Sequence, residues 1–220
     1  MNKHTKRMLI ILGGRYHDFD GFARDISSLF EANGWLVEAT YDLDVLTRLD
    51  AEGCQIILSY TCFSKNDPQQ AEPTPGRMTD QQISGLTDWV QNGGGLLAVH
   101  SATVMGDSGP ELERLLGGRF VSHPEPFTFT ISPVSGGHPI VRGVPAFDVH
   151  DEFYIERCEP PAEILMVAMD QGEKHPMVWS KQEGAGRVAH IAPGHFPDVW
   201  NHPLYQRLMI QAVNWLIKEQ

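Results

Sequence analysis

Hydrophobic positions in the first hundred residues alternate between short continuous runs and runs at helical spacing. The continuous or alternating runs predict strands at 8–12, 35–40, 55–60 and 95–99. The runs at helical spacing predict a helix over 20–33, capped by Asp20, and another over 79–91, capped by Thr79. Strands that alternate with helices in this way are typical of a parallel sheet with helices on both faces.

The pattern changes after residue 120. A short helix over 111–116 precedes Phe127, Phe129 and Ile131, which alternate with polar residues and predict an antiparallel strand. Further strands are predicted at 164–169, 176–179 and 188–191, with a hairpin turn at 184–187, and a last helix is predicted over 205–217. Residues 61–78 show no periodicity and are predicted to form a long loop. Without a repeat or a linker, residues 1–220 are predicted to form one domain.

Composition narrows the class of protein. The chain carries a formal charge of −11, which argues against nucleic acid as a partner, because phosphate binding needs a clustered basic face. The apolar run at 8–12 is too short for a secretion signal, and no run approaches a membrane span, so a cytoplasmic protein without a membrane partner is expected. Three separated cysteines without a CxxC pair agree with a reducing compartment.

Three histidines follow predicted strands of the parallel type: His17, His100 and His195. Because the carboxyl ends of parallel strands gather at one edge of a sheet, these imidazoles are predicted to converge. Neutral imidazoles suit zinc or another borderline divalent ion, which would activate water or polarise a carbonyl. The alternative is that each histidine forms its own hydrogen bonds within a loop. No glycine-rich phosphate motif is present, so no nucleotide cofactor is expected.

Other polar residues near these positions are candidates for chemistry or for ligand binding. Asp151 and Glu152 are a carboxylate pair suited to acid–base catalysis or to binding a sugar hydroxyl, with Tyr154 close by; the alternative is a solvated loop. Ser101 lacks the GxSxG pattern of a serine nucleophile, and its hydroxyl is expected to bind ligand or cap the next turn.

The remaining cysteine and histidine candidates favour structural roles. Cys62 has only Lys65 as a basic neighbour, which favours an inert thiol. His190 lies within a predicted strand and is interpreted as structural. Four histidines that each precede proline are interpreted as turn residues: His123, His138, His175 and His202.

Four segments resemble the ThuA-like, or trehalose-utilisation, family. They are Gly13–Phe19, Gly94–Thr103, Asp151–Tyr154 and the tail from Pro176 through Pro193-Gly194-His195 to Trp215. Two of these segments depart from the usual family pattern. The family usually has Leu-Gly-His where this chain has Pro193-Gly194-His195, and Asp-Glu-Leu-Tyr where it has Asp151-Glu152-Phe153-Tyr154. The resemblance implies a flavodoxin-like, doubly wound fold of the class I glutamine amidotransferase type, with polar positions at His17, His100, Asp151, Glu152 and His195.

The resemblance also bears on activity. A glutamine amidotransferase needs cysteine at the turn where this chain has His100, so glutamine hydrolysis is not expected. The first hypothesis is an enzyme for a sugar, such as a keto derivative of trehalose or a related disaccharide. His100 and His195, with or without a metal such as zinc, would polarise the keto oxygen, and Asp151 or Glu152 would move a proton; His17, Ser101 and Tyr154 would bind substrate.

Two other hypotheses stay open. The chain could be a sugar-binding or regulatory module that lacks the nucleophile, or an amidotransferase that uses Cys62 instead. In each case the partner is a small molecule, and a homodimer is the default expectation for a compact enzyme-like domain.

Overall fold

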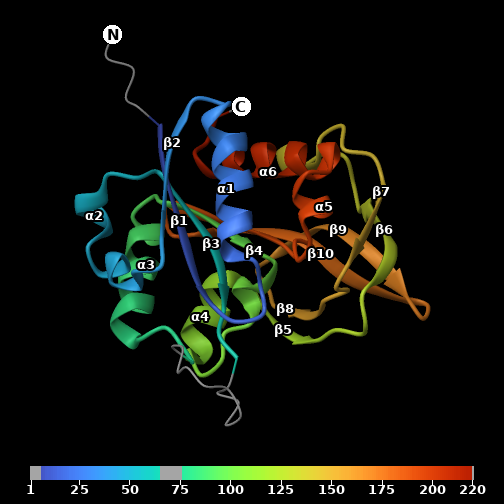
Figure 1. Cartoon of the computed structure of the whole chain (residues 1–220), viewed down its shortest axis with the longest axis horizontal. Helices are drawn as coiled ribbons and strands as arrows, with labels where there is room; N and C mark the ends of the chain where they lie inside the picture. Colours follow the sequence, from blue (N-terminus) through green and yellow to red (C-terminus); the bar gives the residue numbers. More distant parts are fainter. Residues whose placement is uncertain (1–5, 65–75, 220) are drawn as a thin grey trace.

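The computed structural model describes residues 6–64 and 76–219 (Figure 1). Its strands are β1 (Lys6–Gly14), β2 (Trp35–Thr40), β3 (Ile56–Cys62), β4 (Gly95–Val99), β5 (Gly118–Ser122), β6 (Phe127–Pro133), β7 (Phe147–Asp151), β8 (Ile155–Cys158), β9 (Glu163–Asp170), β10 (Glu173–Glu183) and β11 (Gly186–Ile191). Its α-helices are α1 (Phe19–Glu31), α2 (Leu49–Glu52), α3 (Asp80–Gln91), α4 (Gly109–Leu116), α5 (Pro197–Trp200) and α6 (Pro203–Leu216). Three short 3₁₀ helices are η1 (Leu43–Thr47), η2 (His100–Thr103) and η3 (Pro139–Val141).

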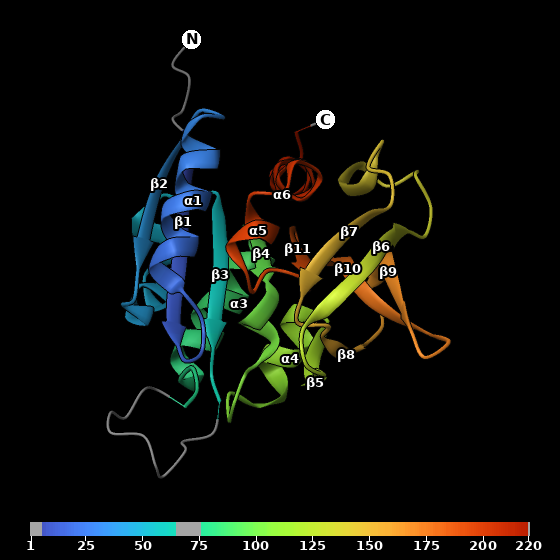
Figure 2. The same cartoon turned by 45° about the vertical axis from the view of Figure 1, so that its right-hand side comes forward.

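Nine of these strands form one sheet in the order β2-β1-β3-β4-β11-β10-β9-β6-β7. The first five pair in parallel, and β10, β9, β6 and β7 continue the sheet in antiparallel fashion. The parallel part has the flavodoxin-like strand order, so the carboxyl ends of β1, β3, β4 and β11 share one edge. Strands β5 and β8 form a separate antiparallel pair below that edge (Figure 2).

Two hydrophobic clusters cover the two faces of the parallel strands. Alternate residues of β1 point to opposite faces: Ile10 belongs to the cluster that includes residues of α1, α5 and α6, whereas Ile11 belongs to the one that includes residues of η1, α3 and α4. Both residues are fully buried, which explains why β1 is hydrophobic at consecutive positions. The predicted α/β class, with helices on both faces and added antiparallel strands, is confirmed.

Local predictions differ from the structure at several places. The first helix is capped by Asp18 rather than Asp20, because the Asp18 carboxylate accepts the Gly21 N–H at 2.9 Å. The cap at Thr79 is confirmed, with a reciprocal bond from the Thr79 N–H to Gln82. The predicted loop 61–78 begins with the end of β3, and its residues 65–75 lie outside the described residues. No helix in 6–64 or 76–219 is long and apolar enough to cross a membrane.

The antiparallel half holds most of the elements that the pattern did not predict. Strands β5, β7 and β8 have four or five residues each, too few to show a clear period. His175 lies inside β10, so its interpretation as a turn residue is wrong: the predicted strand 176–179 is the middle of an eleven-residue strand. The predicted hairpin is confirmed, because β10 and β11 pair in antiparallel fashion across Gly184 and Ala185.

Candidate active site at the sheet edge

His17 is placed by the glycine pair that ends β1. A Cβ at Gly14 would collide with the Cys62 carbonyl oxygen, so only glycine lets β1 stay this close to β3 at the strand ends. The Arg15 N–H then donates to that same carbonyl at 3.1 Å. The chain turns back at this point, and His17 Nδ1 donates to the Arg15 carbonyl at 2.8 Å. His17 Nε2 is therefore the nitrogen that faces the sheet edge, and it is buried without a hydrogen-bond partner.

His100 is the first residue after β4 and is fully buried. Its φ of +46° is rare for a residue with a side chain, and such conformations concentrate at functional turns. His100 Nδ1 donates to the Ala192 carbonyl at 2.7 Å, which fixes the ring between β4 and the end of β11. Like that of His17, its Nε2 is buried without a hydrogen-bond partner.

His195 follows β11 in a loop that hydrogen bonds hold on several sides. The Gly194 carbonyl accepts from Tyr60 Oη at 2.9 Å and from Trp200 Nε1 at 2.5 Å. The Asp151 carboxylate accepts the Gly194 N–H at 2.6 Å and the His195 N–H at 3.1 Å. A Cβ at Gly194 would lie 3.2 Å from His100 Cβ, so a side chain there would crowd the site. These contacts fix the position of His195.

The three rings meet around Glu152, which follows β7. Glu152 Oε2 lies 3.4 Å from His100 Nε2 and 3.2 Å from His195 Nδ1. The His17 ring centre lies 5.0 Å from that of His100 and 4.8 Å from that of His195. One ligand atom from each of the four side chains lies within 4.8 Å of all the others. The predicted convergence of the three histidines is therefore present, and Glu152 is the carboxylate beside them.

Charge at this cluster is divided between neutral and ionised groups. Burial, with a further effect from His100, lowers the pKa of His17 to about 3, so this ring is neutral at pH 7. Burial alone would raise the pKa of Glu152, but contacts with His100 and His195 outweigh it and hold that pKa well below its ordinary value. An ionised carboxylate thus faces imidazole nitrogens that have no other partner, an arrangement suited to a divalent cation.

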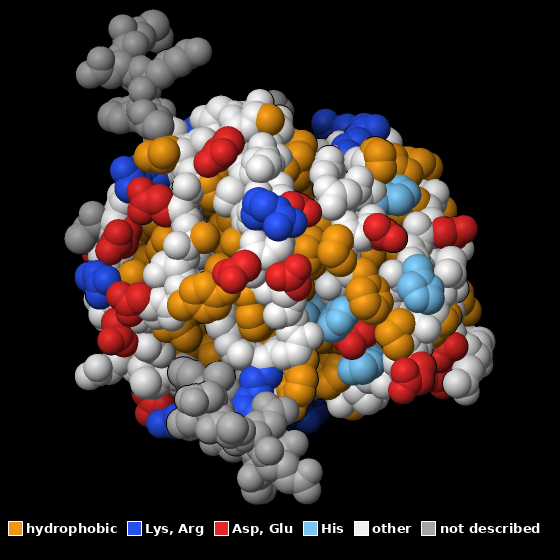
Figure 3. All heavy atoms as spheres, viewed as in Figure 1, with side chains coloured by type: hydrophobic (Ala, Val, Ile, Leu, Met, Phe, Trp, Pro, Cys, Tyr) orange, Lys and Arg blue, Asp and Glu red, His pale blue; other side chains and the backbone are white. Residues whose placement is uncertain are grey.

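A cavity of about 540 Å³ opens beside the cluster, within the range of about 300–1,000 Å³ typical of small-ligand pockets. Its wall combines histidines and Glu152 with aromatic rings, and comprises Tyr16, His17, Cys62, Ser64, Val104, Phe120, His123, Glu152, Tyr154 and His195. Tyr154 stacks on His100, with ring centres 4.0 Å apart. Figure 3 shows histidine side chains reaching the surface beside an acidic side chain, among hydrophobic ones.

The other predicted site residues divide into two groups. Tyr154 lines the cavity, as a ligand-binding residue should. Asp151 is fully buried, burial raises its pKa, and its carboxylate is engaged by backbone N–H groups, which suits a positioning role. Ser101 is fully buried and does not line the cavity, and its hydroxyl forms no hydrogen bond within the described residues, so the expected turn cap is wrong.

His123 is a site residue that the sequence reasoning missed. It follows β5, lines the cavity, and its Nε2 lies 3.8 Å from Glu152 Oε1. The proline after it signals a turn, and nothing in the sequence indicates that the β5–β8 pair brings this turn to the sheet edge.

Cys62 also lines the cavity, but burial raises the pKa of its thiol to about 12. At that pKa the sulfur is a neutral thiol at pH 7, which agrees with the inert role expected from the sequence.

Comparison with known proteins places the chain among relatives of the same fold. A ThuA-like protein from Bacteroides uniformis ATCC 8492 superposes with a TM-score of 0.76 at 17% identity, over 98% of this chain and 93% of that one. One from Parabacteroides merdae ATCC 43184 gives 0.79 at 18% identity, over 97% and 90%. A β-galactosidase from Rahnella sp. R3 gives 0.68 at 13% identity, but only 32% of that chain is covered.

No curated protein matches the sequence. The model of the ThuA family, described as trehalose utilisation, matches residues 7–216. The match spans nearly the whole chain and includes all four clustered side chains, so this protein belongs to the ThuA family.

Proposed function

We propose that this protein is a metal-assisted enzyme that acts on a keto derivative of a small sugar, such as an oxidised form of trehalose or a related disaccharide. One observation carries the proposal: three buried imidazole nitrogens without hydrogen-bond partners surround one carboxylate at the wall of a small-ligand cavity. Buried polar atoms are normally satisfied, so three unsatisfied nitrogens in one place point to a ligand that completes them. The match to a trehalose-utilisation family supports a sugar as the substrate class.

The donor set fits a divalent ion such as zinc. His17, His100 and His195 would hold it, and the first two have their ring orientation fixed by backbone carbonyls, as metal-ligating histidines usually do. Bound there, the ion would supply Lewis acidity toward a carbonyl oxygen of the substrate. Three protein ligands leave a coordination position open, which distinguishes catalytic from structural zinc sites.

Glu152 is the residue best placed to move a proton. It is ionised, partly exposed to the cavity, and within 3.4 Å of two of the imidazole nitrogens. It would accept a proton from the substrate next to the keto group, with His123 beside its other oxygen. Asp151 is unsuited to this step because its oxygens are hydrogen-bonded to the backbone. Tyr154 and Phe120 would pack against the faces of the sugar.

The first experiment is elemental analysis of tag-free protein, comparing wild type with His100→Ala. We expect near-stoichiometric zinc, manganese or iron in the wild type and little in the variant. His150→Ala is the matched control, because His150 is an exposed histidine outside the cluster and should leave the metal content unchanged. Equal metal content in all three proteins, or none in the wild type after growth and purification with added zinc, would contradict the metal site.

A second experiment tests the division of roles. Glu152→Gln should retain the metal but lose turnover of keto disaccharides, followed by NMR of the sugar. Loss of metal in Glu152→Gln would instead make Glu152 a ligand. Unchanged turnover in both His100→Ala and His195→Ala would exclude this site from the reaction.

One observation favours a different function. The turn after β4 carries His100 where an amidotransferase has its nucleophile, as expected of a fold retained for binding alone. In that case, sugar would bind tightly without product over long incubation. Any product that disappears in Glu152→Gln would exclude binding as the only function.

A further inference from the structure

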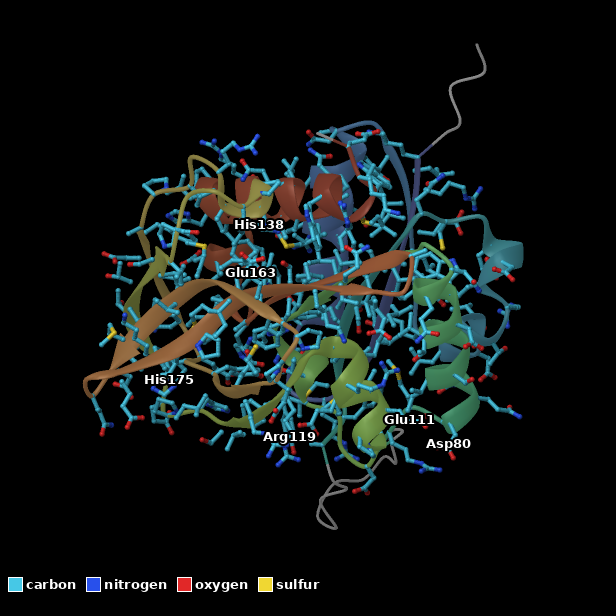
Figure 4. All side chains as sticks on the ribbon, turned by 180° about the vertical axis from the view of Figure 1, so that it is seen from behind. Asp80, Glu111, Arg119, His138, Glu163 and His175 are labelled. Atoms are coloured by element: carbon cyan, nitrogen blue, oxygen red, sulfur yellow. The ribbon has the colours of Figure 1, made fainter. Side chains whose placement is uncertain are left out.

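A second cavity, also of about 540 Å³, lies at the edge of the sheet opposite to the histidine cluster. It is formed by the η3 segment, the start of β11, and α6 with the residues that follow it. Its wall comprises Pro139, Arg142, Arg187, Arg207, Gln211, Asn214, Trp215, Lys218 and Glu219. Figure 4 shows His138, the residue before η3, beside α6 at the upper edge, with Arg119 and Glu111 at the lower edge. From Arg187 to the end of β11 the strand rises roughly 13 Å, so the two cavities are separate.

Four cationic side chains line this cavity: Arg142, Arg187, Arg207 and Lys218. Within the described parts of the chain, none of them is within ion-pair distance of a carboxylate. The acidic residue in the wall, Glu219, pairs with Lys6 at 2.6 Å. The chain as a whole is acidic, with 28 acidic and 17 basic residues. A cavity lined by four cations without acidic partners therefore has a local charge opposite in sign to that of the chain.

Two of the guanidinium groups are held in place before any ligand binds. Arg187 Nη1 donates to the Trp215 carbonyl at 2.5 Å, and its guanidinium carbon lies 4.7 Å from the centre of the Trp215 ring. Its Nε is buried and has no hydrogen-bond partner. Arg207 Nε donates to Gln211 at 2.9 Å, and its Nη2 donates to the Arg142 carbonyl at 3.1 Å. Ordered guanidinium groups lose less conformational freedom when an anion binds.

We propose that this cavity binds a small organic anion with two phosphate groups, of the size of a sugar bisphosphate. Arginine favours phosphate because its planar fork donates two parallel hydrogen bonds to it, and four cations exceed the charge of one phosphate group. The volume is also larger than one phosphate needs and leaves room for an organic body beside Pro139, Asn214 and Trp215. The site is independent of the proposed sugar chemistry at the opposite edge.

Isothermal titration calorimetry tests this proposal, with inorganic pyrophosphate and fructose 1,6-bisphosphate as probes at about 0.15 M salt. We expect one site per chain in the wild type and a Kd at least about tenfold weaker in the variant Arg142→Gln/Arg207→Gln, a change of about 1.4 kcal/mol. The matched control is Arg48→Gln/Arg119→Gln, which removes two charges far from the cavity and should stay within about twofold of wild type.

The single variant Arg142→Gln keeps the test valid if the double variant is destabilised. The Arg142 side chain is exposed, and within the described residues only its backbone atoms form hydrogen bonds. It should show part of the loss, while metal content at the histidine cluster stays as in the wild type. Equal weakening in Arg48→Gln/Arg119→Gln would show that the probes respond only to the net charge of the protein, and it would overturn the proposal. The absence of binding heat with both probes would also overturn the proposal. This holds even if the protein sediments with vesicles of anionic lipid, because the cavity would then bind a lipid surface and not a small bisphosphate.

Discussion

Two groups of histidine and glutamate lie close together in this molecule and differ in whether a cavity opens beside them. Beneath the site, His190 Nε2 and Glu156 Oε2 are 3.0 Å apart, and both side chains are fully buried. Glu156 Oε1 also lies 2.5 Å from the Thr103 hydroxyl, and the His190 ring packs on Trp179 with centres 4.1 Å apart. At the sheet edge, by contrast, Glu152 faces ring nitrogens that no hydrogen bond satisfies, and a cavity opens beside them.

The difference teaches what separates a structural pair from a candidate site. Both groups combine histidine with glutamate, and the outer side chains are only slightly more exposed, so residue type alone does not identify the function. In the inner pair both Glu156 oxygens have protein partners, whereas His190 Nδ1 is buried without one; the pair belongs to the packing between β8, β11 and η2 and does not line the cavity. In the outer group, which borders the cavity, His17 Nε2, His100 Nε2 and His195 Nδ1 have no hydrogen-bond partner among the described residues. Both are connected through η2, because Thr103 lies 3.1 Å from the His100 carbonyl as well as near Glu156.

The largest effect is expected from breaking the inner pair. Glu156→Ala leaves His190 Nε2 buried without its partner and removes one of the two acceptors of the Thr103 hydroxyl, which should lower the free energy of unfolding by about 3–5 kcal/mol. Glu152→Ala should cost less, because Glu152 borders the cavity and water can replace it. Urea unfolding of the metal-free proteins measures both, with Glu163→Ala on β9 as an exposed control within about 0.5 kcal/mol of wild type.

The reverse order of the two unfolding free energies would contradict the comparison. It would mean that the outer cluster, and not the inner pair, stabilises the fold.

The next effect tests the positioning of His195. Asp151→Ala removes the acceptor of the Gly194 and His195 N–H groups but no atom of the cluster itself. We expect zinc affinity to fall by about 10- to 100-fold, the usual range for groups that orient a metal ligand. Competition with a chelator of known affinity measures this. Asp151→Asn, which keeps one carbonyl acceptor, should recover part of the affinity; equal loss in both variants would point to general destabilisation.

The sequence predicts the outer cluster better than its surroundings, for a physical reason. His17, His100 and His195 follow parallel strands, and parallel strands place their carboxyl ends together whatever the details of packing. His123 depends on the pairing of β5 with β8, two short strands without a clear pattern. The second cavity, with its four cationic side chains, is lined by residues from three separated segments, and no periodicity in the sequence relates these segments. The role of Asp151 is decided by which backbone groups its side chain reaches, which no spacing reveals.

A smaller effect is expected from pH, measured on metal-free protein. Burial lowers the pKa of folded His17 to about 3 from an ordinary value of 6.5, so the unfolded chain binds the proton more readily. This contribution to stability is complete above pH 6.5 and is lost as pH falls from 6.5 toward 3. Between pH 6.5 and 5, which lies above the ordinary pKa of glutamate, the wild type should lose about 1.5 kcal/mol more than His17→Gln.

Urea unfolding at several pH values in the presence of a chelator gives the two slopes. His150→Gln serves as control, because His150 is exposed and should leave the slope unchanged. Parallel slopes for wild type and His17→Gln would show that the His17 ring is not held neutral by the fold.

The smallest effect is expected at Cys62. Its side chain lies on the cavity wall, but we expect it to have a structural role, like the inner pair. Its pKa of about 12 leaves about one thiolate in 10⁵ molecules at pH 7, so the sulfur has little nucleophilic or metal-binding power. Cys62→Ala should therefore change metal content and sugar turnover by less than about twofold, while His195→Ala removes both. Ammonia release from glutamine is the opposing measurement, and hydrolysis by the wild type that Cys62→Ala abolishes would restore an amidotransferase role. Without it, a place on the cavity wall is not enough for a role in the proposed reaction: Cys62 is a neutral thiol, whereas Glu152 is ionised and faces imidazole nitrogens without hydrogen-bond partners.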